Sequence, residues 1–166
     1  MQTDKLKYFD NKTPFFSLND IKTYDRVADV TDGDTIVLII PILGDNYYKF
    51  HVRINGIDTC ETRSDDICIK EQGLKAKYRT IELLSNKNIK DIIGITKNQI
   101  KNLFDNLLSL VWIECFDFDK YGRLLCNIFI DNKKNLADIL IEEKLAYKYD
   151  GTTKLSEIEQ KRILGI

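Results

Sequence analysis

The chain has few residues of the types that build zinc sites. Its 166 residues include one histidine and four cysteines, Cys60, Cys68, Cys115 and Cys126. The cysteines lack the close pairs of zinc sites and one histidine cannot supply the missing ligands, so a zinc site is a poor explanation. Basic and acidic residues number 25 and 26. This balance argues against a protein that coats nucleic acid through bulk charge, but it leaves room for a local basic site.

Long apolar runs are also missing. The longest, TIVLIIPIL at residues 35–43, is too short for a membrane span and contains Pro41. Residues 1–18 contain no apolar run of signal-peptide length. We therefore expect an intracellular, cytoplasmic protein with reduced cysteines and no membrane partner.

The order of the periodic segments predicts the fold. Residues 1–20 are polar with scattered aromatics and suggest an N-terminal extension, followed by a single domain at 21–166. Strand patterns occur at 24–30, 35–40, 47–54, 111–117 and 123–130, with a turn at 44–46 and a loop at 55–66. Helices are expected at 67–84, through Ile100, near Asn135 and at 154–164. This order predicts an α+β fold, a five-stranded β-barrel of the oligonucleotide-binding (OB) type with three to four helices packed on it.

Two helical segments carry recognisable apolar faces. In 67–84 the stripe is Leu74, Tyr78 and Ile81, with Gly73 as a weak point. The second helix follows a connector at 86–99, and its apolar residues fall on one face: Ile100, Leu103, Phe104, Leu107 and Leu108. Residues 85–110 could be a lid, a substrate shelf or a packing element, and the regular stripe favours packing.

Charged residues gather at the predicted strand ends. Asp32 and Asp34 lie in DGDT at 32–35, and Arg53 ends a strand. Two further clusters are DTCE at 58–61 and DKYGR at 119–123. Each cluster alone fits ordinary turn or surface chemistry. An EF-hand is excluded for DFDKYG, because its twelfth position would be Ile128 in place of the required glutamate.

Together these clusters suggest one chemistry. Asp34 and Asp58 offer carboxylate oxygens, which calcium prefers as ligands. Arg53 and Arg123, on separate strands, can clamp a phosphate through planar, charge-assisted hydrogen bonds. Glu61 can take a proton from water. Such a set favours metal-dependent hydrolysis of a phosphodiester.

The order DGDT, VRINGIDTCE, DKYGR and LIEEKLA resembles the staphylococcal nuclease (thermonuclease) family over roughly residues 22–150. The resemblance implies an OB-type barrel with three helices and a calcium-dependent endonuclease that hydrolyses DNA, RNA or both and leaves 3′-phosphates. It implies three sets of site residues: Arg53, Glu61 and Arg123 as catalytic residues, Asp34, Asp58 and the backbone carbonyl of Thr59 as Ca²⁺ ligands, and Lys120, Tyr121 and Tyr149 for substrate binding.

The chain departs from the family pattern at Cys60, where the family has proline. Proline restricts the residue before it, so we expect a less rigidly aimed Thr59 carbonyl and weaker calcium binding. Tyr147 and Tyr149 follow LIEEKLA sooner than expected, and either could stack a base. His51 shares a strand face with Arg53, and we expect an exposed strand histidine there, not a general base.

An alternative function is a catalytically weak or inactive OB-fold module that binds nucleic acid. A third class is a protein-interaction module on the same barrel. An inactive member should have lost at least one of five charged residues, yet Asp34, Arg53, Asp58, Glu61 and Arg123 are all present. The sequence therefore favours the enzyme, with nucleic acid as substrate and a monomer as the expected state.

Overall fold

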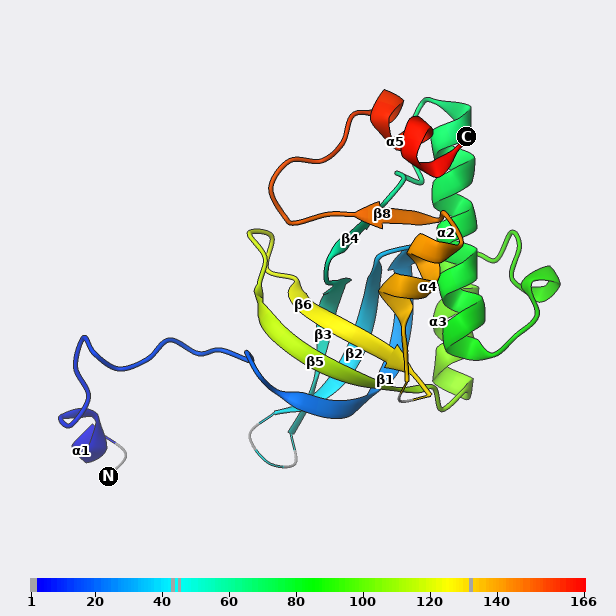
Figure 1. Cartoon of the computed structure of the whole chain (residues 1–166). Coiled ribbons are helices and arrows are strands. Elements are labelled where there is room, and N and C mark those ends of the chain that lie inside the picture. Colours follow the sequence, from blue (N-terminus) through cyan, green and yellow to red (C-terminus); the bar gives the residue numbers. More distant parts are fainter. Residues whose placement is uncertain (1–2, 43, 45, 132) are drawn as a thin grey trace.

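A closed, mixed β-barrel forms the centre of the molecule (Figure 1). The computed structural model describes residues 3–42, 44, 46–131 and 133–166. Five strands run in the order β3-β2-β1-β5-β6, and parallel pairing of β3 with β6 closes the barrel. These strands are β1 (Lys22–Asp32), β2 (Thr35–Ile42), β3 (Asn46–Ile54), β5 (Leu110–Phe118) and β6 (Leu124–Ile130). The predicted five-stranded OB-type barrel is confirmed, while the turn expected at 44–46 includes residue 45, which lies outside the described residues.

Three further strands are short. β7 (Lys134–Asn135) pairs with β6, whereas β4 (Ile57–Thr59) and β8 (Ala146–Lys148) pair only with each other in the described part of the chain. The prediction of a loop over 55–66 is therefore wrong for residues 57–59, which form β4. Three residues carry too little alternation to reveal a strand, and the partner of β4 comes from the far end of the chain.

Helices cover one side and one end of the barrel (Figure 1). They are α2 (Ile67–Ser85), α3 (Lys97–Asn106), α4 (Leu136–Glu142) and α5 (Glu157–Leu164), with the 3-10 helix η1 (Ile89–Asp91) between α2 and α3. A fifth helix, α1 (Thr3–Leu6), lies in the N-terminal segment. The predicted three to four packed helices are confirmed as α2 to α5.

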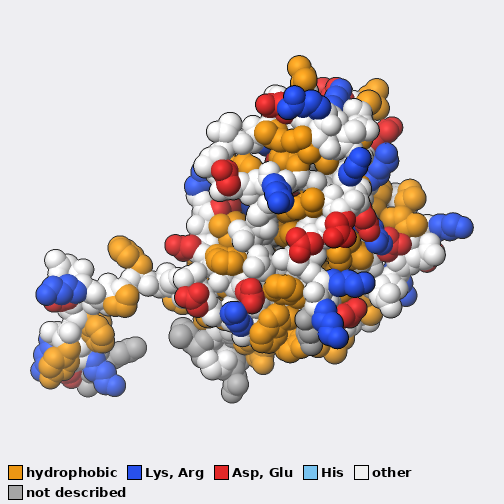
Figure 2. Space-filling view, in the orientation of Figure 1, with side chains coloured by type: hydrophobic (Ala, Val, Ile, Leu, Met, Phe, Trp, Pro, Cys, Tyr) orange, Lys and Arg blue, Asp and Glu red, His pale blue; other side chains and the backbone are white. Residues whose placement is uncertain are grey.

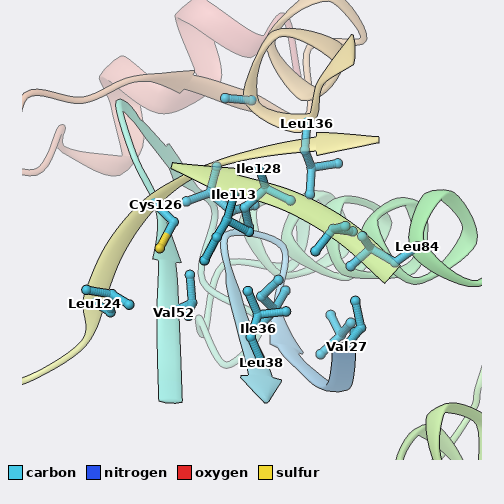
Figure 3. Close-up of a cluster of buried hydrophobic side chains, with 14 of the residues drawn as sticks. Val27, Ile36, Leu38, Val52, Leu84, Ile113, Leu124, Cys126, Ile128 and Leu136 are labelled. Atoms are coloured by element: carbon cyan, nitrogen blue, oxygen red, sulfur yellow. The ribbon is translucent and has the colours of Figure 1, made fainter. Parts of the chain in front are cut away.

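The barrel interior holds the main hydrophobic core. Side chains from different strands meet there, as Ile36, Leu38, Val52, Ile113 and Ile128 do in Figure 3. All five are fully buried, and burying one such side chain contributes about 1.5–3 kcal/mol. Because the inward residues of each strand alternate with outward ones, the core also fixes which charged residues reach the barrel rim.

Helix α2 lies very close to the rim at its glycine. A Cβ added to Gly73 would lie 2.4 Å from the carbonyl oxygen of Cys60, so no larger residue fits without a shift. Likewise, a Cβ on Gly33 would lie 2.7 Å from Cβ of Ala76, and Thr80 donates a hydrogen bond of 2.8 Å to the Gly33 carbonyl. Of the stripe predicted for α2, Ile81 is buried in the main core and Tyr78 packs against it, whereas Leu74 is only half-buried and is not part of that core. Small residues form the closest contacts of the helix with the rim, and Gly73 is one of them.

The segment before β5 packs against the barrel. Ile100 and Phe104 of α3 are fully buried in the main core, and α3 packs on β1. Arg26 donates to the carbonyl oxygens of Phe104 and Asp105, which satisfies the end of the helix. The helix ends at Asn106 and leaves Leu108 69% exposed, so the predicted apolar face does not extend to Leu108. This segment is a packing element, as the sequence favoured.

The N-terminal segment leads away from the barrel (Figure 1). Residues 3–17 are exposed and carry several apolar side chains, seen at the left of Figure 2, whereas Leu18 is buried in the main core. Of the helices in the described part of the chain, none combines the length and the apolar character that a membrane crossing requires.

Candidate active site

Arg53 joins two buried carboxylates at the rim of the barrel. Its Nη1 lies 2.9 Å from Oδ2 of Asp34, and its Nη2 lies 2.5 Å from Oδ1 of Asp58. Nη2 also donates to the carbonyl oxygen of Ile57 at 3.1 Å. The three side chains are each less than a tenth exposed. Sequence analysis named all three, and the structure brings them together.

The DGDT turn places Asp34 between two strands. β1 ends at Asp32 and β2 begins at Thr35, so Asp34 lies in the turn that joins them. Thr35 donates its hydroxyl to Oδ1 of Asp34 at 3.0 Å, and the backbone N–H of Thr59 donates to Oδ2 at 3.1 Å. Burial raises the pKa of Asp34 above its ordinary value, and the charge of Arg53 offsets part of that rise. Asp32 instead accepts a hydrogen bond from Thr62, so it anchors the neighbouring loop.

Asp58 is held from the opposite side by Tyr147 and Lys154. The Tyr147 hydroxyl donates to Oδ2 of Asp58 at 2.5 Å, and Nζ of Lys154 lies 3.2 Å from the same oxygen. Burial alone would raise the pKa of Asp58, but the hydrogen bonds from Tyr147 and Arg53 lower it below its ordinary value. Tyr147 is 2% exposed, so the idea that it stacks a base is wrong. β8 pairs with β4 and points this ring inward.

Glu61 follows β4 and faces solvent beside Lys154. Its side chain is 65% exposed, and its Oε1 lies 2.5 Å from Nζ of Lys154. Burial would lower the pKa of Lys154, but its hydrogen bond to Glu61 and the charge of Asp58 raise it above the ordinary value. Lys154 therefore links Glu61 to the buried carboxylates. Sequence analysis missed Lys154, since a lysine in the stretch GTTK carries no local signal.

Arg123 lies on the same rim and is oriented by Asp119. Its Nε and Nη2 each lie 2.7 Å from Oδ2 of Asp119, and Nη1 donates to the Thr35 hydroxyl at 3.5 Å. Thr35 in turn donates to Asp34, which places Arg123 one hydroxyl away from the buried cluster. Although burial acts against it, backbone and guanidinium N–H donors lower the pKa of Asp119. The sequence indicated Asp119 only as part of the DKYGR turn. Its spacing of four residues from Arg123 could have indicated that the two side chains form an ion pair.

An open cavity of about 780 Å³ is lined by Arg53, Asp58, Glu61 and Arg123. Asp34 and Thr59 lie behind this lining and are not among its residues in the described chain. The predicted substrate-binding residues also line the cavity: Lys120, Tyr121 and Tyr149. Two rings lie beside the arginines, with the guanidinium carbon of Arg53 5.4 Å from the Tyr149 ring centroid and that of Arg123 5.4 Å from the Tyr121 centroid. His51, by contrast, is exposed on β3 and is not among the lining residues of the described chain.

Thr59 and Cys60 are held without the family's proline. Thr59 lies in β4, paired with Ala146 of β8, and donates to Asp34. The backbone of Cys60 packs on Gly73. Cys60 is 2% exposed, and burial raises the pKa of its thiol to about 11, which disfavours the thiolate that a soft metal needs. Strand pairing thus holds Thr59, and the weaker calcium binding expected from the missing proline stays a prediction.

The carboxylates of the cluster are too few to surround a hard cation, so backbone and water oxygens would have to complete its ligands. No group of three or more His, Cys, Asp or Glu side chains in the described chain is placed to hold a metal ion. Asp34 and Asp58 could supply two carboxylates and Thr59 a carbonyl oxygen, and calcium accepts such oxygens together with water. Asp34, Asp58 and Glu61 face the cations Arg53 and Lys154, so the cluster keeps one net negative charge. Two carboxylates and a backbone carbonyl are oxygen donors of the kind that calcium prefers, and calcium binding at this cluster stays a prediction.

Comparison with known proteins finds a matching family and several relatives. The family model for staphylococcal nuclease homologues matches residues 51–164, and Asp34, outside that range, is tied to it through Arg53. The chain is 31% identical over 157 residues to the uncharacterized protein MJ1439 of Methanocaldococcus jannaschii, covering 85% of this chain and 64% of that protein. It is 30% identical over 144 residues to endonuclease YncB of Bacillus subtilis, covering 85% of this chain and 54% of that one.

A third relative is the SPbeta prophage-derived endonuclease YokF of Bacillus subtilis, 29% identical over 135 residues, with 80% of this chain and 36% of that protein covered. The chain thus spans between about a third and two thirds of the length of these relatives. The family match covers more than half of the chain and includes every site residue from Arg53 onward. The chain therefore belongs to the staphylococcal nuclease homologue family.

Proposed function

We propose that the chain is a calcium-dependent endonuclease that hydrolyses phosphodiester bonds of DNA, RNA or both and leaves 3′-phosphates. One observation carries the proposal: Arg53, held between Asp34 and Asp58, lines the same cavity as Glu61 and Arg123. Family membership and the endonuclease names of two relatives support it.

The two arginines are suited to bind a phosphate. Within the described chain the hydrogen bonds of Arg53 use three of its five N–H donors, and the other two would serve a ligand. Asp119 fixes Arg123 in one orientation, so little freedom is lost when Arg123 binds. Oriented donors aimed at the oxygens of a phosphate stabilise charge that develops in the transition state.

In the proposed reaction Glu61 accepts a proton from the attacking water. The water oxygen forms a bond to phosphorus while its proton passes to the Glu61 carboxylate. The bond from phosphorus to the 5′-oxygen breaks, and that oxygen takes up a proton from a solvent water in the open cavity, while Glu61 returns its proton to solvent. One fragment then ends in a 3′-phosphate and the other in a 5′-hydroxyl. Because Glu61 is 65% exposed, water can reach it.

The carboxylates of Asp34 and Asp58 and the carbonyl oxygen of Thr59 would hold the calcium ion. When bound, the ion supplies Lewis-acid neutralisation of charge on the phosphate oxygens. Lys120 and the exposed Tyr121 would contact a neighbouring phosphate, and the half-buried ring of Tyr149 would stack on a base.

A cleavage assay tests the proposal. Circular plasmid DNA and RNA should be degraded by the protein with millimolar calcium, and excess chelator should stop the reaction. The fragments should resist 3′-end tailing until phosphatase removes the terminal phosphate. Intact polymer after long incubation at high protein concentration would rule out the enzyme.

A matched pair of variants tests the role of Glu61. Glu61→Gln should lower turnover by roughly 10²–10⁴-fold because the amide accepts no proton. Glu71→Gln makes the same change at an exposed position of α2 and should cleave at the parental rate. Nucleotide binding, measured separately, should survive in both variants.

A further inference from the structure

Lys154 lies where a cation would approach the carboxylate cluster. Its Nζ is 3.2 Å from Oδ2 of Asp58 and 2.5 Å from Oε1 of Glu61, and it lines the same cavity. Its side chain is 37% exposed, so it sits at the boundary between the buried carboxylates and solvent. None of the phosphate-binding or proton-transfer steps derived above uses it.

The chain around Lys154 is fixed on both sides. Before it, β8 pairs with β4. After it, α5 is tied to α2 and its preceding loop, through Lys161 to Asp66 at 2.5 Å and through Glu157 to Ser64 at 2.7 Å. Leu164 of α5 packs in a small cluster with Cys60 and Tyr147. The fold therefore holds the base of this lysine close to the cluster.

The four oxygens of Asp34 and Asp58 each accept a hydrogen bond or ion pair within the described chain. On Asp58, Arg53 takes Oδ1, whereas Tyr147 and Lys154 share Oδ2. A divalent ion on Asp58 would lie within a few ångströms of the Lys154 ammonium, and like charges at that distance repel. A divalent ion bound to Asp58 would therefore weaken the ion pair between Lys154 and Asp58, and the ion pair would weaken binding of the ion.

We propose that Lys154 is a resident counter-ion that competes with the divalent cation for Asp58 and Glu61, and so sets the cation concentration at which the site fills. The inference rests on the proposed function, because it takes Asp58 as a ligand of that cation. Competition is reciprocal: calcium weakens the hold of Lys154 on Glu61 by the same factor by which Lys154 weakens calcium binding. Release of Lys154 frees the Glu61 oxygen for water.

Calorimetry of calcium binding, without substrate, tests the competition. Lys154→Gln removes the charge and should bind calcium about three- to tenfold more tightly than the parent, an ordinary size for coupling between two sites. Lys154→Arg keeps the charge and should stay within about twofold of the parent by the same measure. Lys148→Gln, on the exposed face of β8, makes the same charge change away from the carboxylates and should also stay close to the parent.

A second readout separates competition from a purely structural role. In chelator, Lys154→Gln loses the ion pairs to Asp58 and Glu61 and should melt below the parent. As calcium rises to saturation this difference should shrink or reverse, because tighter binding adds stability. A lysine that only fastened the loop would give the same difference in melting temperature at every calcium concentration.

The outcomes separate this inference from the proposed function. Equal calcium affinities of Lys154→Gln and the parent, with cleavage intact, overturn the inference and leave the endonuclease standing. Tighter calcium binding by Lys154→Gln, with no cleavage by the parent, supports the counter-ion and overturns the endonuclease. Calcium binding by neither protein overturns the counter-ion.

Discussion

The molecule buries carboxylates at the rim of the barrel and inside it, and their surroundings differ. At the rim, every oxygen of Asp34 and Asp58 is paired. Asp25 of β1 is 1% exposed, and neither of its oxygens has a hydrogen-bond partner in the described part of the chain. Burial raises the pKa of Asp25 to about 7 and also raises that of Asp34, whereas the pKa of Asp58 stays below its ordinary value.

The difference lies in the donors, since burial is nearly equal. A buried carboxylate stays charged only where cations and N–H or O–H donors replace the lost water. Arg53 and Tyr147 do this for Asp58, each from a different part of the chain. Asp25 has no such support among the described residues and is protonated over most of the acid range. A charged rim suits a site that binds cations, whereas Asp25 costs stability at neutral pH.

Removing Arg53 should break the rim most severely. Arg53→Met leaves Asp34 and Asp58 buried without their shared cation, which we expect to cost about 3–5 kcal/mol in the free energy of unfolding. Urea unfolding measures this, with the exposed Arg63→Met as control. Saturating calcium should recover part of the loss. Equal effects of the two variants would mean that the rim carboxylates do not depend on Arg53.

Replacing Arg123 should lower the rate of cleavage without lowering the stability of the rim. Arg123 touches the cluster only through Thr35 and is 27% exposed, so Arg123→Met should change unfolding little. Loss of one preorganised donor should lower kcat about 10²–10³-fold, or roughly 3–4 kcal/mol. Asp119→Asn, which only weakens the orientation of Arg123, should fall between this variant and the parent. Cleavage by Arg123→Met at the parental rate would remove Arg123 from the catalytic residues.

Much of the rim could be predicted because its signals are local. Strand alternation in β3 puts Val52 and Ile54 inside the barrel, and Arg53 lies at the end of that strand. Acidic residues beside a glycine at a strand end, as in DGDT, mark a turn with an unusual charge density. The order of these motifs was then specific enough to indicate Asp34, Arg53 and Asp58 together.

Tyr147 and Lys154 could not be predicted because their roles depend on distant pairing. Tyr147 reaches Asp58 only because β8 returns to β4 late in the chain, and both strands have three residues. The loop that carries Lys154 is positioned by α5 docking on α2, which no spacing in the sequence encodes. Asp25 shares the inward face of β1 with Val27, yet an aspartate in a strand gives no sign that it lacks partners.

Asp25→Asn should increase the stability of the protein at neutral pH, whereas removing a paired rim carboxylate should decrease it. The folded pKa of Asp25, about 7, exceeds the ordinary 3.8, so the stability tied to its bound proton is complete below pH 4 and is lost as pH rises toward 7. Asparagine cannot ionise. The unfolding free energy of the variant relative to the parent should therefore rise by about 2–3 kcal/mol between pH 5 and pH 8.

Urea unfolding at several pH values measures this slope, with the exposed Asp105→Asn as control. The control should show no such rise across the same range. A parallel course of the Asp25→Asn and parental curves would mean that Asp25 is as well compensated as Asp58.

Tyr147→Phe removes a single oxygen atom and takes one hydrogen-bond donor away from Asp58, so that this carboxylate becomes more like the unpaired Asp25. The change removes the hydroxyl that donates to Oδ2 of Asp58 and leaves Lys154 as that oxygen's partner in the described chain. The ring still fills its buried place, so the expected cost is that of one charge-assisted hydrogen bond, about 1.5–3 kcal/mol at neutral pH. Because Asp58 has a lowered pKa, its pairing adds stability above pH 4 that is lost as pH falls. The cost should therefore shrink on acidification, and a cost independent of pH would show that the ring, not the hydrogen bond, supports the rim.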